Sequence, residues 1–320
     1  MIAESLLAAD QAYPKVSVCV ITYNQERYIG ECLQSLVEQE TNFDFEIVVG
    51  DDSSTDGTRA IIMDFVHRYP SLIRINFQPH NTGGSQNNID VHAKARGDYV
   101  AHLDGDDFAL PSRLQAQADV LDSDYGCNAV WHLVDFFDDL GGFCSGYTAD
   151  LSMFPNGIVS FRKAIRLGYV GVYSSLMYRR TALSSIDRQR NILDLYFTWD
   201  TLSKGHGVIL NQVLGRYRVA STGSLQAKSS TRVRDFAIEH AYEFLARHFE
   251  HRRDFMIWAL TGALISIKHG QGRGAYDYFR LAWHARTWIG LTEVCSNLVN
   301  MRRQRVKWPE KRQMPPKETP

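Results

Sequence analysis

An acidic cluster of Asp104, Asp106 and Asp107 follows a short apolar segment, 99–103, that has the character of a buried strand. Alternate residues of a strand point to the same side, so Asp104 and Asp106 can leave the strand end together, with Gly105 keeping the backbone close. Carboxylates held together repel each other and favour a cation between them. Mg²⁺ and Mn²⁺ prefer such oxygen ligands and commonly share them with substrate phosphates. The spacing therefore predicts a metal site on Asp104 and Asp106 for a phosphorylated ligand; an acidic turn in solvent is the alternative.

The overall composition excludes several classes of protein. The chain has 320 residues, of which 44% are hydrophobic and 22% charged, and its net charge is −1. These values are ordinary for a globular protein and give no sign of nucleic-acid binding. The five cysteines form no C-x-x-C pair, which favours a reducing compartment without a zinc site. Neither a signal peptide nor an apolar run long enough to span a membrane is found, so we expect a cytoplasmic protein.

Predicted strands and helices alternate through the first part of the chain. The strands are expected at 16–22, 45–50, 72–77 and 99–103. Helices are expected at 26–39 and 86–96, and a third one between the second and third strands ends before Pro70. Such alternation with short connections is typical of an α/β fold with a parallel sheet, which binds ligands at the carboxyl ends of its strands. Polar clusters follow three of these strands: Thr22-Tyr23-Asn24, Asp51-Asp52 and Asp104-Gly105-Asp106. No G-x-G-x-x-G follows the first strand, so a dinucleotide site is not expected.

Residues 16–134 resemble a family-2 glycosyltransferase with the GT-A fold. The matching motifs, in order, are VSVCVITYN, EIVVGDDSSTDGT, the turn Asn81-Thr82-Gly83, ARGDYVAHLDGDD and LPSRLQ. The later segments 173–180, 197–200 and 215–219 resemble the family more loosely. The resemblance implies a Rossmann-like, mostly parallel sheet flanked by helices, followed by a C-terminal helical region.

These patterns divide the chain into four parts. An N-terminal extension (1–14) precedes a glycosyltransferase domain (15–225), which comprises a nucleotide-sugar-binding half (15–134) and an acceptor half (135–225). A C-terminal helical region (226–303) and a basic, Pro-containing tail (304–320) follow. The segment 285–303 has partly periodic apolar residues and precedes a cluster of basic ones. It could dock peripherally on the inner face of the cell membrane, or pack on the transferase domain.

The resemblance implies transfer of a sugar from a nucleotide diphosphate to an acceptor hydroxyl, with inversion at the anomeric carbon and with Mn²⁺ or Mg²⁺ on Asp106 and Asp104. We expect a UDP-sugar donor and a glycan or lipid-linked acceptor, in polysaccharide or glycolipid biosynthesis. Asp52 could accept a hydrogen bond from a uracil N–H, and Tyr23 could pack against the ring. The residues expected to bind the nucleotide sugar are Thr22, Tyr23, Asn24, Asp52, Asp104 and Gly105.

Four further residues have expected roles, two from the same resemblance (Asp200 and the position of Ala220) and two from their place in the chain (Arg113 and His102). Asp200, in the segment 197–200, is predicted to be the catalytic base that takes the proton of the acceptor hydroxyl, with Asp194 as the alternative. Relatives often carry a histidine ligand after the closing strand, where this chain has Ala220, so a third metal ligand stays open. Arg113 could contact phosphate or be a surface charge. His102, inside the fourth strand, is expected to be a hydrogen-bonded core residue.

Two other functions compete with a glycosyltransferase. A nucleotidyltransferase can share the sheet and the metal carboxylates, but it usually carries a glycine-rich basic loop after the first strand, where this chain has Thr22-Tyr23-Asn24-Gln25-Glu26. A non-catalytic binding protein on a transferase fold should have lost its carboxylates. The predicted functional carboxylates are all present, at Asp52, Asp104, Asp106 and Asp200.

Overall fold

The structure is a computed structural model that describes residues 13–138, 143–144, 149–184, 186, 191–219 and 230–304. Three predictions concern residues outside these ranges: most of the N-terminal extension, the position Ala220, and the basic tail after residue 304. The description below is confined to the ranges given.

The centre of the fold is a mixed sheet of 10 strands in the order β3-β2-β1-β4-β9-β6-β10-β5, with β7 paired to β6 and β8 to β10. The half formed by β3-β2-β1-β4 is parallel, and β9 joins it antiparallel, so the predicted α/β fold is confirmed. Two predicted strands run one residue further than expected, into Asp51 and Asp104. The strands are β1 (Val16–Thr22), β2 (Phe45–Asp51), β3 (Ile73–Phe77), β4 (Tyr99–Asp104), β5 (Phe108–Ala109), β6 (Cys127–Phe137), β7 (Phe143–Cys144), β8 (Ile158–Ser160), β9 (Met177–Arg179) and β10 (His206–Arg218).

The register of the parallel strands brings three carboxyl ends to one edge of the sheet. Strand β1 lies between β2 and β4, and Thr22 pairs with Asp51 while Ile21 pairs with Asp104. The chain leaves β1 toward β2 on one side and reaches β4 on the other, which is the kind of switch point at which such sheets bind ligands. The polar clusters that follow these strands therefore lie together, as the sequence predicts.

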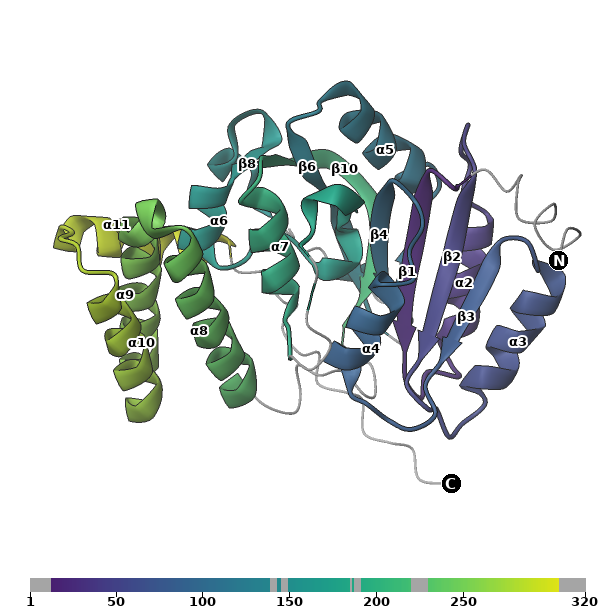
Figure 1. The fold of residues 1–320 in the computed structure, drawn as a ribbon, viewed down its shortest axis with the longest axis horizontal. Helices are drawn as coiled ribbons and strands as arrows, with labels where there is room; N and C mark the ends of the chain where they lie inside the picture. Colours follow the sequence, from purple (N-terminus) through teal and green to yellow (C-terminus); the bar gives the residue numbers. More distant parts are fainter. Residues whose placement is uncertain are drawn as a thin grey trace, which may run out of the picture.

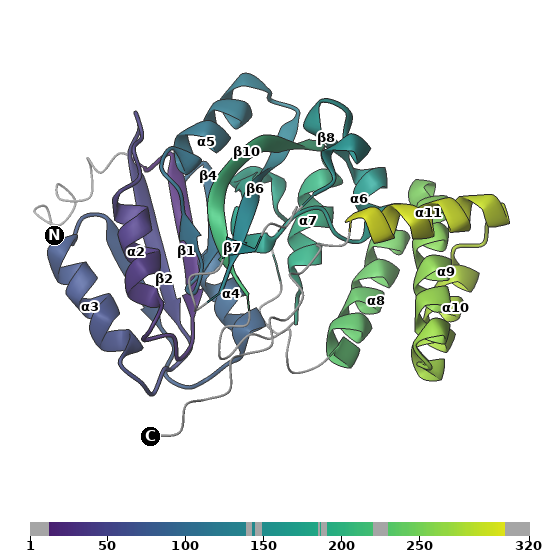
Figure 2. The ribbon, with the colours of Figure 1, turned by 180° about the vertical axis from the view of Figure 1, so that it is seen from behind.

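Helices cover both faces of the sheet and form two apolar cores (Figures 1 and 2). One core packs α2, α3 and α5 against one face; the other packs α4, α6 and α7 against the opposite face and continues into α8 and α9. In α2 every buried residue belongs to the apolar stripe that its helical spacing predicts. The helices are α2 (Ile29–Val37), α3 (Thr58–Arg68), α4 (Gly84–His92), α5 (Arg113–Ser123), α6 (Phe161–Leu167), α7 (Asp194–Leu202), α8 (Ser230–Arg247), α9 (Arg252–Lys268), α10 (Gly272–His284) and α11 (Leu291–Gln304).

The C-terminal helices form a block at the end of the molecule away from β1–β3 (Figure 1). The predicted apolar helix of 285–303 begins later, at Leu291, and packs by one face: Val294 is buried, and the Asn297 amide donates to the backbone oxygen of Arg166 at 2.9 Å. Trp288, by contrast, is 92% exposed. One face of this helix thus packs against the rest of the protein, and the other face is exposed. Among the described helices, none has the length and apolar character needed to cross a bilayer.

A buried carboxylate joins the parallel strands at the end of the sheet opposite the acidic cluster. Glu46 on β2 is 3% exposed and accepts a hydrogen bond from Ser17 on β1 at 2.7 Å. It also pairs with Arg74 on β3 and with Arg96, just before β4, each at 2.8 Å. Burial raises the pKa of Glu46, but the hydrogen bonds from these partners outweigh it and hold the pKa below its ordinary value. Glu46 therefore stabilises the sheet in its ionised form.

We predict that Glu46→Gln lowers the free energy of unfolding at pH 7 by about 1–3 kcal/mol, because charge-assisted hydrogen bonds become neutral ones. A carboxyl with a lowered pKa stabilises the folded state above the pKa of the unfolded chain, and this contribution is lost as pH falls through the lowered value. The gap between the two proteins should thus close below about pH 4. Urea titrations at several pH values measure it, with the exposed Glu38→Gln as the control. An equal gap at all pH values would contradict the assignment.

Candidate functional site

The acidic cluster lies where β4 ends, held by contacts from distant parts of the chain. The Asp104 carboxylate lies 3.1 Å from His102 Nε2 and accepts a hydrogen bond from the Ser174 hydroxyl at 3.2 Å. The Asp107 carboxylate accepts a hydrogen bond from the Arg218 backbone N–H at 2.7 Å. Asp107 is only 2% exposed, whereas Asp104 and Asp106 are partly exposed. The two carboxylates predicted to bind metal are therefore the two that a ligand can reach.

The electrostatics of the cluster fit a bound cation. Burial raises the pKa of Asp107 well above its ordinary value, and the charges of Asp106 and then Asp104 raise it further. The second carboxylate oxygen of Asp107 is buried without a hydrogen-bond partner. A divalent cation on Asp104 and Asp106 would relieve this concentration of charge, with phosphate oxygens as its other ligands. Among the described residues no group of three or more His, Cys, Asp or Glu side chains is arranged to hold a metal by itself.

Gly105 brings the acidic turn against the end of β1. Its N–H donates to the backbone oxygen of Ile21 at 2.9 Å. A Cβ on Gly105 would lie 2.6 Å from the Gln25 side-chain oxygen and 2.9 Å from Thr22 Cβ, closer than such atoms approach in proteins. The glycine thus permits the close backbone approach that the sequence predicts.

Asp52, predicted to bind the nucleotide base, organises a neighbouring turn. One carboxylate oxygen accepts hydrogen bonds from the N–H and hydroxyl of Thr82, at 2.7 and 2.8 Å, and the other accepts from the N–H of Gly83 at 2.8 Å. Gly83 has a φ of 88°, which glycine adopts without strain. A carboxylate offers about four acceptor positions, so these three donors leave capacity for one more. Asp51 faces elsewhere, toward Arg59 and the Ser54 N–H.

The other predicted nucleotide-binding residues differ in accessibility. Tyr23 is 44% exposed and presents its ring to solvent. Thr22 is buried and donates to Gln25 at 2.7 Å. Asn24 has a φ of 51° and accepts a hydrogen bond from the Thr55 N–H at 2.8 Å. Thr22 and Asn24 thus shape the loop, and Tyr23 is the most exposed of the three.

A buried chain of hydrogen bonds reaches Asp104 from behind. The Tyr178 hydroxyl lies 2.8 Å from His92 Nδ1, His92 Nε2 lies 3.0 Å from His102 Nδ1, and His102 Nε2 faces Asp104. With both imidazoles neutral, the Tyr178 hydroxyl can donate to His92, His92 to His102, and His102 to Asp104. Every ring nitrogen then has a partner. Burial, and then the neighbouring His102, lower the pKa of His92, which favours that neutral form. His102 is the hydrogen-bonded core residue that we predict, but its link to the site and the whole role of His92 are missed by sequence reasoning.

Arg113 is neither a phosphate contact nor a surface charge. It is fully buried beneath β4, and its guanidinium donates to the backbone oxygen of His102 at 2.8 Å. Burial lowers its pKa to about 10. Both sequence-based interpretations of Arg113 are therefore wrong, because the first turn of α5 points into the core.

Asp200, the predicted catalytic base, is occupied by structural contacts. It is fully buried and pairs with Arg247 on α8 at 2.9 Å and with Lys204 at 3.1 Å. It also accepts hydrogen bonds from the N–H and hydroxyl of Ser184. Burial raises its pKa, but these donors outweigh it and hold the pKa below its ordinary value. The structure brings Asp200 together with α8 and not with the acidic cluster.

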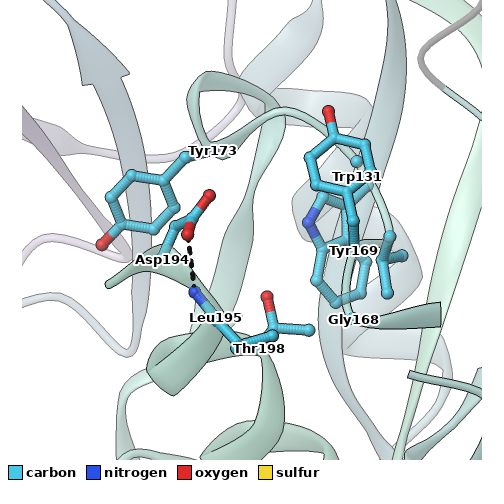
Figure 3. Close-up of a pocket in the computed structure, with 9 residues that line it drawn as sticks. Trp131, Gly168, Tyr169, Tyr173, Asp194, Leu195 and Thr198 are labelled. Atoms are coloured by element: carbon cyan, nitrogen blue, oxygen red, sulfur yellow. Dashed lines mark hydrogen bonds between the residues drawn. The ribbon is translucent and has the colours of Figure 1, made fainter. Parts of the chain in front are cut away.

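Asp194, the alternative, lies at the start of α7 beside Tyr173 (Figure 3). Its carboxylate accepts a hydrogen bond from the Leu195 N–H at 2.8 Å. It lines a cavity of about 10 Å³, together with Trp131, Tyr169 and Thr198, which is about the room that one water molecule needs. The desolvation caused by surrounding atoms raises the pKa of Asp194, and the charge of Asp104 adds to this effect. An exposed carboxylate within electrostatic reach of Asp104 meets the requirements of a base better than Asp200 does.

Comparisons with known proteins agree with this geometry. An uncharacterized glycosyltransferase of Nostoc sp. (strain PCC 7120) is 26% identical over 292 residues, which cover 88% of this chain and 88% of that protein. Curated relatives that are 39% identical match over 120 residues, and this chain spans 35% of their length.

Two solved structures have the same fold. TarS 1-349 of S. aureus, in complex with UDP-GlcNAc, matches with a TM-score of 0.63 at 20% identity, over 89% of each chain. A mannosyltransferase of Pyrobaculum calidifontis, in complex with GDP-Man and Mn²⁺, matches with a TM-score of 0.56 at 16% identity, over 95% of this chain and 89% of that one. Identities this low establish the fold alone, which is the predicted GT-A fold.

The sequence profile of the family described as Glycosyl transferase family 2 matches residues 17–186. The match is more than half of the 320 residues and contains both the acidic cluster and the strand ends beside it. The chain therefore belongs to glycosyl transferase family 2.

Proposed function

We propose that the protein transfers a sugar from a nucleotide diphosphate, with a UDP-sugar as preferred donor, to a hydroxyl of a polysaccharide or glycolipid, with inversion. The observation that carries this proposal is the meeting of three polar strand ends beside Asp104 and Asp106 at the switch point of the sheet. The solved structures of similar fold hold UDP-GlcNAc in one case and GDP-Man with Mn²⁺ in the other, which supports a nucleotide-sugar donor here.

The donor would lie across the carboxyl ends of β1, β2 and β4. Tyr23 offers its ring face to the base, and Asp52 offers its remaining acceptor position to a base N–H. Asp106 and Asp104 would hold Mn²⁺ or Mg²⁺, which supplies Lewis-acid stabilisation of the leaving diphosphate. His102 and Ser174 keep the Asp104 carboxylate in one orientation from the protein side.

In this proposal the acceptor hydroxyl loses its proton to Asp194. Its oxygen forms a bond to the anomeric carbon while the bond from that carbon to the diphosphate breaks, so the configuration inverts. A carboxylate with a raised pKa is a better proton acceptor than an ordinary one. Asp200 keeps a structural role, since Arg247 and Lys204 compete for its carboxylate.

Asp194→Asn should lower turnover about 10²–10⁴-fold, the usual contribution of a positioned general base. Nucleotide binding should persist, because Asp194 lies on the acceptor side. Asp200→Asn is the matched comparison, and it should lower the melting temperature more than it lowers turnover at a permissive temperature. Steady-state kinetics and thermal unfolding of both variants separate the two roles. Normal turnover in Asp194→Asn with a severe loss in Asp200→Asn would return the role to Asp200.

A second prediction concerns the donor and the cation. UDP in the presence of Mn²⁺ should raise the melting temperature of the protein more than GDP does, because a ligand of the folded state stabilises it. Asp106→Asn should keep the fold and lose this shift, whereas Asp119→Asn, on the exposed side of α5, should keep it. A shift that survives EDTA unchanged would remove the cation from the proposal. Nucleotide binding without any consumption of nucleotide sugars would favour a non-catalytic binding protein.

Peripheral membrane contact is a separate part of the proposal. Trp283 and Trp288 are 81% and 92% exposed on the C-terminal block, and tryptophan favours the membrane interface. The exposed Arg302 and Arg303 end α11, and each basic residue near an anionic surface adds about 1 kcal/mol.

This contact predicts salt-sensitive sedimentation with phosphatidylglycerol vesicles. A variant with both Trp283→Ala and Trp288→Ala should stay in the supernatant, because the aromatic anchors are gone. Tyr125→Ala is the control, since Tyr125 is 88% exposed but lies outside the C-terminal block. Wild-type protein that stays in the supernatant at low salt would refute membrane docking.

A further inference from the structure

A groove lies between α6 and α11, apart from the acidic cluster. Its volume is about 460 Å³, which is within the range of small-molecule binding sites. Arg162, Lys163 and Arg166 line it from α6, where their spacing puts them on one face of the helix. The opposite side comes from one face of α11 and is polar, with one acidic residue, Glu293.

The α6 side of the groove carries more positive charge than its neighbours neutralise. Arg162 and Arg166 share one buried carboxylate, Asp254, with an Nε–Oδ1 distance of 3.0 Å for Arg162 and 2.5 Å for Arg166. Lys163 makes no ion pair with any described carboxylate; its ammonium lies over the Phe154 ring. Two guanidinium groups thus share one acid, and the Lys163 ammonium beside them has no ion pair with a described carboxylate.

Two observations indicate that an anion would stabilise this arrangement. Burial, and then the charge of Arg166, lower the pKa of Lys163, so its surroundings destabilise its positive charge. One terminal nitrogen of Arg166, Nη2, is buried without a hydrogen-bond partner. The acidic residue that lines the groove, Glu293, is paired with Arg253 at 2.7 Å. The charge of Arg166 also reaches Glu293, whereas Lys163 has no ion pair with a described carboxylate.

The α11 side has the chemistry that recognises sugars. Thr292, Ser296 and Asn300 line the groove at intervals of one helical turn. Hydroxyl and amide groups both donate and accept hydrogen bonds, as the hydroxyls of a sugar or polyol require. A cationic wall facing such a row matches a ligand that is both anionic and hydroxylated.

We propose that the groove between α6 and α11 binds an anionic glycan, a sugar or polyol chain that carries phosphate or carboxylate groups. The identification of this glycan as part of the acceptor rests on the proposed function. Leu167 lines the groove, and the next residue, Gly168, lines the cavity beside Asp194. An acceptor chain held in the groove would thus be tethered next to the residues that surround the proposed base.

The test is calorimetric titration of the full chain with glucose 6-phosphate and glucuronate, with glucose and inorganic phosphate as separate arms. The phosphorylated or carboxylated sugar should bind about tenfold or more tightly than glucose or phosphate, because it uses both walls. Whichever of glucose 6-phosphate and glucuronate binds more tightly identifies the anionic group as phosphate or carboxylate. Lys163→Gln should weaken binding about tenfold, whereas Lys268→Gln, an exposed lysine at the end of α9, should not change it.

A second variant tests the polar wall. Ser296→Ala should weaken the binding of the anionic sugar and leave that of inorganic phosphate unchanged. Equal affinity for phosphate and glucose 6-phosphate would reduce the groove to an anion site and overturn the proposal, as would unchanged binding in Lys163→Gln or no binding at all.

The same variants separate this inference from the proposed function. The UDP-dependent shift in melting temperature should be the same in Lys163→Gln and wild type. Sugar transfer without binding in the groove would refute the groove alone. Binding in the groove without consumption of nucleotide sugars would refute the transferase proposal alone.

Discussion

The negative charge concentrated at the end of β4 is the constraint on which the site depends. Three carboxylates within four residues must share one strand end without driving it apart. The Arg218 backbone N–H holds Asp107, and its side-chain Nε donates to the backbone oxygen of Asp106 at 2.9 Å. Arg113, fully buried below, supplies positive charge from within the core. Strand β10, through Arg218, and helix α5, through Arg113, therefore both stabilise the acidic cluster.

The segment predicted to be the acceptor half, 135–225, also contacts the acidic cluster at the end of β4. The turn before β9 supplies Ser174, and β9 supplies Tyr178, the start of the hydrogen-bond chain that ends at Asp104. With both imidazoles neutral, this chain orients the carboxylate without adding a charge beside the predicted cation site. The orientation of Asp104 thus depends on residues at least 70 positions away in the sequence.

The carboxylates of this fold differ in their surroundings. Some are enclosed by hydrogen-bond donors, and others are exposed. Glu46 and Asp200 each have both carboxylate oxygens engaged by donors from other elements, and they join strands and helices. Asp106 and Asp194 are partly or fully exposed. A carboxylate surrounded by cations is a poor base because its pKa is low. Exposure and partners, more than residue type, therefore separate the acids that join elements of the fold from those that a ligand can reach.

The sequence by itself determined the alternation of strands and helices, the parallel half of the sheet and the meeting of Thr22, Asp51 and Asp104 at one edge. These features follow from local hydrophobic periodicity and from the geometry of parallel strands, both of which can be read along the chain. Only the tertiary structure enclosed Asp200 in ion pairs, buried Arg113 and linked His92 to Asp104. Spacing puts Asp194 and Asp200 on one short helix, but it does not reveal that Arg247, from α8, pairs with Asp200. Such contacts between elements far apart in sequence set burial and pKa, and no local pattern encodes them.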